Sequence, residues 1–230
     1  MDESTLETEI PLAERAYRDL RLAIVRCEFE PGERLRVDDL GRRYEISNTP
    51  IREALSRLAE QGLVRLIDNR GFRVSPLTVD GIADLTRMRL LIECEALKDA
   101  ISNGDDAWET TMVAAAHSLS LIEQRLGVAP VALDNNWSER HRAFHLAIYS
   151  ACKSPLLKDL VVQLFDSAER YRRYSASQRQ TARGKHNEHD KILKCVLTRD
   201  ADAAIVLLTK HIKATENTVT TALINLTQKK

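Results

Sequence analysis

Proline, glycine and cysteine are scarce in this chain of 230 residues, which contains six prolines, eight glycines and four cysteines. Helix-forming Ala, Leu, Arg and Glu dominate instead, so we expect a mostly helical protein. The cysteines show no short spacing; they are Cys27, Cys94, Cys152 and Cys195. This excludes a disulfide framework and a cysteine-based zinc site, and it is typical of reduced thiols in the cytoplasm.

Net charge and long apolar runs are also lacking. The 34 Lys and Arg residues balance 34 Asp and Glu residues, which argues against a polybasic protein that holds its partner by bulk charge alone. No stretch approaches the roughly 18 apolar residues of a membrane span. The acidic start at residues 1–4 is unlike a signal peptide. We therefore expect a globular cytoplasmic protein that has no membrane partner.

Lysine is missing from residues 1–75, which contain 13 arginines, whereas all six histidines lie beyond residue 110. Between these regions Pro76 disfavours helix in the residue before it, and Thr78 or Asp80 can cap a new helix. We predict a first domain at residues 1–75, a linker at 76–80 and a second domain at 81–230.

The first domain has the element order of a winged helix-turn-helix. Periodicity and capping signals predict helices at 11–27, at 37–44 and from about 47–50 to Gly62. Two β-type runs follow at 63–67 and 71–74, joined by a turn at 68–70.

The apolar residues of the third helix fall on one side, namely Ile51, Ala54, Leu55 and Leu58. Arg52 and Arg57 then project away from the core, with Thr49 at the helix start. Arginines on such a helix can bind guanine or phosphate in a major groove, and Arg70 at the hairpin tip could reach an adjacent groove. Charge alone also allows ion pairs with Glu53 on a solvated helix, because residues 42–73 hold only seven arginines against four acids.

The run ISNTPIREALSRL at 46–58, followed by QGLV at 61–64 and Arg70-Gly71, resembles the recognition region of GntR-family transcription regulators. With PGERL at 31–35 the resemblance spans most of residues 12–75. It implies that the chain binds operator DNA, that Arg52 contacts DNA and that the wing around Gly71 approaches the minor groove. Asn48 stands where many members have a DNA-contacting arginine, so no operator sequence carries over. The candidate DNA-binding residues are Ser47, Asn48, Thr49, Arg52, Arg57, Arg70 and Gly71.

The second domain is expected to be an antiparallel bundle of six helices, so the fold class is mainly α. The predicted helices cover about 78–102, 106–126, 133–152, 155–175, 179–198 and 200–224. A bundle of this size can bury a core and leave a central cavity.

Four histidines lie on apolar faces of three predicted helices. His141 and His145 are i,i+4 neighbours, and His189 and His211 each share a face with aliphatic residues. Desolvated neutral imidazoles need partners, which a divalent metal would supply collectively. Imidazole ligands favour zinc, nickel, copper or iron over magnesium or calcium. The alternative is a polar core in which carboxylates or carbonyls satisfy the rings.

Three further charged positions of the second domain allow two interpretations each. Arg89 lies among apolar residues with Glu93 one turn on, so it is either a fork for an effector carboxylate or half of a structural ion pair. Arg172 either edges the cavity or belongs to a helix end whose side chains extend to water. Glu188 either orients His189 or is solvated.

The segments RAFH at 142–145, EH at 188–189 and KHI at 210–212 resemble the FCD ligand-binding domain of the FadR-like GntR branch, over about residues 80–224. Many FCD domains hold a metal through Asp-x-x-x-His on one helix and one histidine on each of two later helices. The resemblance therefore implies that His145, His189 and His211 are ligands, while His141 occupies the aspartate position. It also implies that Arg89 lines the effector cavity. A four-histidine site, a three-histidine site and no metal all remain open.

These observations together predict a homodimeric DNA-binding transcription regulator that is not an enzyme. Repression relieved by effector is the commoner case for regulators of the family that it resembles, while the sequence itself leaves repressor and activator open. The helical domain of this regulator would bind a small carboxylate effector through Arg89, Glu93 and Arg172 at a divalent transition metal, zinc or alternatively nickel. The alternatives are a metal-free regulator with a polar histidine core and a histidine-ligated metalloenzyme. The enzyme interpretation leaves the Arg52 helix unexplained, and no well-placed general base lies near the histidines.

Overall fold

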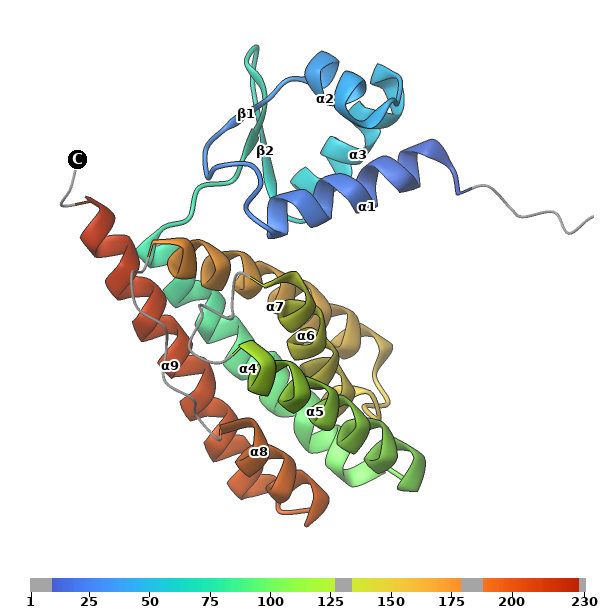
Figure 1. Cartoon of the computed structure of the whole chain (residues 1–230), viewed down its shortest axis with the longest axis vertical. Coiled ribbons are helices and arrows are strands. Elements are labelled where there is room, and N and C mark those ends of the chain that lie inside the picture. Colours follow the sequence, from blue (N-terminus) through green and yellow to red (C-terminus); the bar gives the residue numbers. More distant parts are fainter. Residues whose placement is uncertain (1–9, 127–133, 179–187, 228–230) are drawn as a thin grey trace, which may run out of the picture. The chain divides into compact units, whose positions relative to one another are not determined.

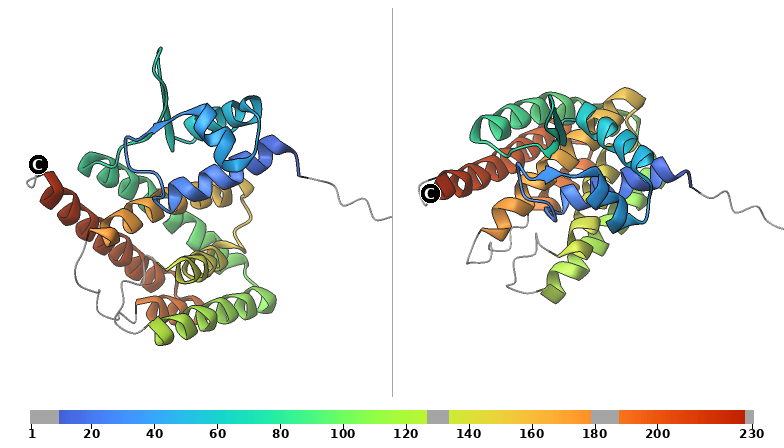
Figure 2. Two further views of the ribbon diagram at one scale, coloured as in Figure 1. Left: turned by 45° about the horizontal axis from the view of Figure 1, so that its top comes forward. Right: turned by 90° about the horizontal axis from the view of Figure 1, so that it is seen from above.

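A computed structural model describes residues 10–126, 134–178 and 188–227 of the chain (Figure 1). The chain divides into two compact units, Met1–Pro76 and Leu77–Lys230. Figure 2 gives two further views of the same ribbon. Within the described ranges, no helix combines the length and the apolar character that crossing a membrane requires.

The first unit is a winged helix-turn-helix, as the sequence predicts. Its elements are α1 (Leu12–Val25), β1 (Arg34–Leu35), α2 (Val37–Tyr44), α3 (Asn48–Glu60), β2 (Val64–Ile67) and β3 (Gly71–Val74). The three strands form an antiparallel sheet in the order β1-β3-β2. The sequence pattern does not predict β1, because two residues are too few to show alternation.

The core of this unit fixes which side of α3 faces outward. All four residues predicted to face inward, from Ile51 to Leu58, are completely buried. They pack in one apolar cluster with Leu20 and Ile24 of α1 and with Phe72 of β3. Because this side of α3 is held inside, the intervening positions are presented to solvent.

The second unit is a helical bundle, which confirms the predicted fold class. Its helices are α4 (Val79–Asn103), α5 (Asp106–Leu126), α6 (Asn135–Tyr149), α7 (Pro155–Ser177), α8 (Glu188–Leu197) and α9 (Ala201–Thr227). Polar caps set several starts: Asp134 accepts a hydrogen bond from Trp137 N, and Ser154 accepts one from Leu157 N. The first part of the helix predicted at 179–198 lies outside the described residues.

The larger of two apolar clusters described in the bundle surrounds the candidate site. The helix α4 packs along α9 and α7, while α5 packs on α6 and α8. Leu97, Met112, Phe144, Ile148 and Leu208 are fully buried in this core. The packing brings the inward faces of α6, α8 and α9 into one interior, where the candidate site lies.

The start of α4 is held by α7. Thr78 caps α4 by accepting a hydrogen bond from Gly81 N at 3.0 Å. The Thr78 backbone N–H in turn donates to the hydroxyl oxygen of Tyr171 at 3.5 Å. A Cβ atom on Gly81 would lie 2.3 Å from that hydroxyl oxygen, so only glycine fits this turn without moving Tyr171.

Candidate metal centre and nucleic-acid surface

Four imidazoles converge inside the bundle. His141 and His145 come from α6, His189 from α8 and His211 from α9. One ring nitrogen from each histidine lies within 4.8 Å of the corresponding atom of every other. The structure thus brings together all four histidines that periodicity places on inward faces.

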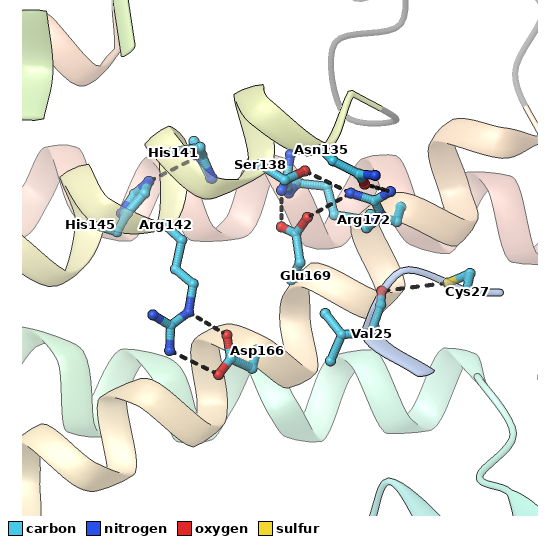
Figure 3. Close-up of polar contacts among 11 residues, drawn as sticks. Val25, Cys27, Asn135, Ser138, His141, Arg142, His145, Asp166, Glu169 and Arg172 are labelled. Carbon is cyan, nitrogen blue, oxygen red and sulfur yellow. Dashed lines mark hydrogen bonds and ion pairs between the residues drawn. The ribbon is translucent and has the colours of Figure 1, made fainter. Parts of the chain in front are cut away.

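The closest pair has the spacing of two ligands on one ion. His141 Nε2 and His145 Nε2 are 3.1 Å apart, and the two rings, on successive turns of α6, meet edge to face (Figure 3). Zinc binds imidazole nitrogen at about 2.0–2.1 Å, so two nitrogens in a tetrahedral shell lie roughly 3.3 Å apart. The i,i+4 spacing on a helix therefore prepares this pair as a chelate.

Hydrogen bonding alone does not satisfy these two rings. Across the 3.1 Å contact one neutral ring must donate and the other accept, so the rings take opposite tautomers. Both Nδ1 atoms are buried and, among the residues that the structure describes, neither has a hydrogen-bond partner. A cation between the rings would accept both Nε2 lone pairs and remove the requirement for opposite tautomers. The donor set therefore fits a metal ion.

A carboxylate orients a third ring. Glu188 Oε2 lies 2.8 Å from His211 Nδ1, which leaves Nε2 of that ring available as a ligand. Metal-binding histidines commonly have such a carboxylate partner on their second nitrogen. The sequence interpretation linked Glu188 to its neighbour His189 or to solvent. The structure places its carboxylate against His211 of α9.

Aromatic side chains exclude water from the histidine cluster. Trp137 stacks on His141 with ring centroids 4.5 Å apart, and Phe144 and Phe165 lie against His145 at 5.3 Å. Burial lowers the pKa of His141 well below its ordinary value of 6.5, and the Arg172 guanidinium lowers it further. Burial likewise lowers the pKa of His145, with His189 adding to the effect. Both rings are therefore neutral and able to bind a metal at pH 7.

Arg89 and Glu93 form a buried ion pair on α4. Arg89 Nε lies 2.5 Å from Glu93 Oε1, and Nη2 lies 3.2 Å from Oε2. Tyr149 donates to the same carboxylate, with its hydroxyl oxygen 2.8 Å from Oε2. Burial and the adjacent Glu93 hold the pKa of Tyr149 well above 10. The sequence analysis missed Tyr149, although its position four residues after His145 places it on the same face of α6.

Arg172 lies beside the histidine cluster. Its guanidinium carbon is 4.5 Å from the centroid of Trp137, the ring that stacks on His141. It also forms an ion pair with Glu169 of its own helix (Figure 3). Arg172 therefore reaches the candidate site through Trp137.

The segment 170–174 is not a helix end with solvated side chains. The helix α7 continues to Ser177, and Arg170 and Arg173 are both buried. Arg173 donates to Ser138 Oγ at 2.9 Å and to Asn135 Oδ1 at 2.7 Å. The solvated interpretation was wrong because α7 continues two residues beyond the predicted end at 175 and the bundle buries these arginines, with Arg173 bonded to α6.

The candidate DNA-binding residues gather at one end of α3 and at the wing tip. Ser47, Thr49 and Arg52 are exposed at the start of α3, as are Arg70 and Gly71 at the hairpin turn. Gly71 has φ +74°, a conformation that suits glycine at this turn.

Two of the candidates have partners within the first unit. Asn48 Nδ2 donates to Asp38 Oδ1 at 2.7 Å. Arg57 lies over the ring of Tyr17 at 4.0 Å, and its two terminal nitrogens donate to Glu14 Oε2 at 3.0 and 3.1 Å. Arg57 thus joins α3 to α1, whereas Arg52 has no such contact among the described residues.

Comparison with known proteins agrees with this architecture. Residues 12–74 match the family described as bacterial regulatory proteins, gntR family, and residues 84–214 match the FCD domain. The chain is 39% identical over 208 residues to the HTH-type transcriptional regulator BphR of Paraburkholderia xenovorans, covering 90% of this chain and 85% of that protein. It is 36% identical over 200 residues to the HTH-type transcriptional repressor GlaR of Escherichia coli, covering 85% and 90%.

Solved structures share the fold. E. coli McbR/YncC matches with a TM-score of 0.77 at 19% sequence identity, covering 91% of this chain and 97% of that one. A putative transcriptional regulator GntR from Rhodococcus sp. RHA1 matches with a TM-score of 0.68 at 24% identity, covering 90% and 96%. At these identities the likeness concerns the fold.

Proposed function

The chain belongs to the gntR family of bacterial regulatory proteins and carries an FCD domain, and we propose that a small carboxylate effector, bound at a four-histidine metal site, controls its affinity for operator DNA. Membership of this family makes the chain a DNA-binding transcription regulator rather than a metalloenzyme. In this proposal residues 1–75 read the operator, and residues 81–230 bind the effector and dimerise.

The observation that carries the proposal is the convergence of His141, His145, His189 and His211 within 4.8 Å. Four neutral nitrogen donors suit zinc, with nickel as the alternative. A bound divalent ion would provide a positive charge to which the carboxylate oxygens of an effector can coordinate. Three histidines match the ligand pattern that the FCD resemblance implies, while His141 replaces an anionic aspartate and so leaves the site more positive.

Two guanidiniums support a carboxylate as the effector. Arg172 lowers the pKa of His141 and Arg89 lowers that of His145, so both contribute positive charge at the cluster. Each guanidinium is paired with a glutamate of its own helix, Glu169 or Glu93. An effector carboxylate would compete for these arginines, and charge-assisted bonds to a guanidinium are strong enough to favour one arrangement of the helices.

We propose repression by a homodimer. Two copies of the recognition helix would bind a two-fold operator, so the dimer sets their spacing. GlaR, which is 36% identical to this chain, is named a transcriptional repressor. Effector binding would then change the preferred spacing and release the operator.

The test uses untagged protein that has not been exposed to a nickel column during purification. We expect about one zinc or nickel ion per chain by elemental analysis, and a lower melting temperature after treatment with a chelator. A screen of di- and hydroxycarboxylates should give a hit that stabilises the metal-loaded protein, by about 2.7 kcal/mol at a hundredfold excess over Kd. The same compound should weaken binding to the DNA upstream of the gene.

Matched variants separate the metal from general stability. His145→Gln should lose both the metal and the chelator effect, whereas His117→Gln, at an exposed position, should retain both. If the wild-type protein contains no stoichiometric metal and its melting temperature does not change with chelator, the metal proposal is wrong. The protein would then be a regulator with a polar histidine core. If a carboxylate stabilises the chelator-treated protein as much as the metal-loaded protein, the effector binds at Arg89 and does not need the metal.

A further inference from the structure

Three arginines lie side by side on the sheet of the first unit. The strand register pairs Arg34 with Arg73 and Arg73 with Arg65, and all three side chains are exposed. Directly opposed residues share one face of an antiparallel sheet, and neighbouring strands lie about 4.8 Å apart. These residues, here named the arginine row, therefore span about 10 Å across the three strands.

The arginine row faces away from the core. The next residue pairs in the same register are Leu35 with Phe72 and Phe72 with Leu66. Leu35 and Phe72 are buried in the apolar cluster with α1 and α3. Because side chains alternate along a strand, the row occupies the opposite face of the sheet.

The fold does not neutralise this row. Like charges directly opposite each other destabilise a sheet. Arg73 Nη1 donates to the Gly32 carbonyl oxygen at 2.9 Å, but this contact cancels no charge. Arg34 and Arg65 make no hydrogen bond or ion pair with any residue in the part of the chain that the structure describes. The repulsion within the row therefore lowers stability, and no acidic side chain of the described residues pairs with Arg34 or Arg65 to offset it.

Positive charge continues from the row to the wing tip. Arg70 is exposed in the turn immediately before β3, three residues ahead of Arg73. At about 3.3 Å per residue, that distance is roughly 10 Å along the strand. The tip that the family resemblance brings to a minor groove therefore lies only about 10 Å along β3 from the arginine row.

We propose that the arginine row binds DNA phosphates beside the groove that the wing enters, and so supplies affinity that is independent of sequence. This inference rests on the proposed function, in which the first unit binds operator DNA. Duplex DNA presents one charge per roughly 1.7 Å of its axis, and guanidinium groups bind phosphate oxygens in pairs. An unneutralised row that continues the wing matches such an extended polyanion.

The test is the salt dependence of DNA binding by the full-length chain. The main variant is Arg34→Gln with Arg65→Gln, which keeps Arg73 and its bond to Gly32. Fluorescence anisotropy would follow binding to a random-sequence duplex and to the DNA upstream of the gene. The slope of log K against log salt should become shallower by about 0.9 for each lost phosphate contact, or about 1.8 per bound protomer, on both DNAs. The ratio of the two affinities should stay unchanged.

Two further variants control for folding and for general charge. Arg34→Lys with Arg65→Lys keeps the charge, so it should retain most of the slope. Arg125→Gln removes an exposed arginine of α5 and should leave the slope unchanged. The glutamine variant should melt at the same temperature as wild type or higher, because the repulsion across the strands is removed.

The outcomes separate this inference from the proposed function. If wild type prefers its upstream DNA but the glutamine variant keeps the wild-type slope, the row does not bind phosphate and faces another partner, such as an acidic protein surface. If wild type shows no preference for its upstream DNA, the proposal that the first unit recognises an operator sequence is wrong. A slope change with the random duplex alone would then still support phosphate binding by the row.

Discussion

The hydroxyl of Tyr149 donates to Glu93 Oε2 at 2.8 Å and so joins α6 to α4 inside the bundle. Glu93 is completely buried and carries a charge that Arg89 balances from one turn away. The contact links the helix that bears His141 and His145 to the helix that begins at the boundary between the two units.

Tyr149→Phe should therefore lower the free energy of unfolding by about 1–3 kcal/mol, because a buried charged acceptor loses one of its donors. Urea denaturation followed by circular dichroism measures this change. Tyr17→Phe is the matched control, since Tyr17 accepts its bond from Gln61 at an exposed position. An equal loss in both variants would show that Glu93 does not depend on the hydroxyl.

His141→Asp should change which metal the site prefers. An anionic oxygen ligand suits manganese better than imidazole does. We expect manganese to raise the melting temperature of the variant more than that of wild type, with a smaller advantage for zinc. His117→Asp should leave the metal response unaltered, because that side chain is exposed. An unchanged order of metals in His141→Asp would mean that residue 141 is not a ligand.

Acid should destabilise the chelator-treated protein. The pKa values of His141 and His145 are lowered by burial in the folded state, whereas in the unfolded chain these rings titrate near 6.5. Below that pH the unfolded state binds more protons, so stability falls as the pH decreases until the lowered pKa is reached. The slope approaches about 1.4 kcal/mol per pH unit for each ring. Melting curves from about pH 8 to about pH 5 measure it, and His145→Gln should make the slope shallower. A flat wild-type profile would contradict the burial of neutral rings.

Arg52 and Arg57 should respond differently to substitution. Arg52→Gln should lower the preference for upstream over random DNA by about 1–3 kcal/mol if Arg52 contacts a base, with little change in melting. Arg57→Gln should mainly lower stability, by about 0.2–1 kcal/mol for a half-exposed ion pair, because it loses Glu14 and Tyr17. If Arg52→Gln keeps the full preference, Arg52 does not read sequence.

Periodicity predicts the parts of this fold that depend on a single helix. It places Ile51 and Leu58 inside, and it predicts inward faces for His141, His145, His189 and His211, because a helix fixes directions around its own axis. Contacts between side chains of different helices cannot be predicted from the periodicity of one helix. The partner of Glu188 depends on how α8 lies against α9, which the sequence spacing does not define.

Arg57 illustrates the same limit at the surface. Its position on α3 is intermediate between the buried and the exposed sides, and its long side chain can extend toward either solvent or α1. Only the packing of α1 against α3 supplies Glu14 and Tyr17 as partners. The strand β1 was not predicted for a related reason, because its two residues form a strand only through their pairing with β3.

Tyr171 and Arg172 are consecutive residues of α7 that touch different parts of the helical unit. Arg172 touches Trp137, which stacks on His141, and Tyr171 touches the first turn of α4 at Thr78. Because the two residues are adjacent on one turn of α7, this turn contacts both the aromatic ring beside the histidine cluster and the first turn of α4. Within the helical unit, α7 thus links the imidazoles to the turn through which the chain enters the bundle.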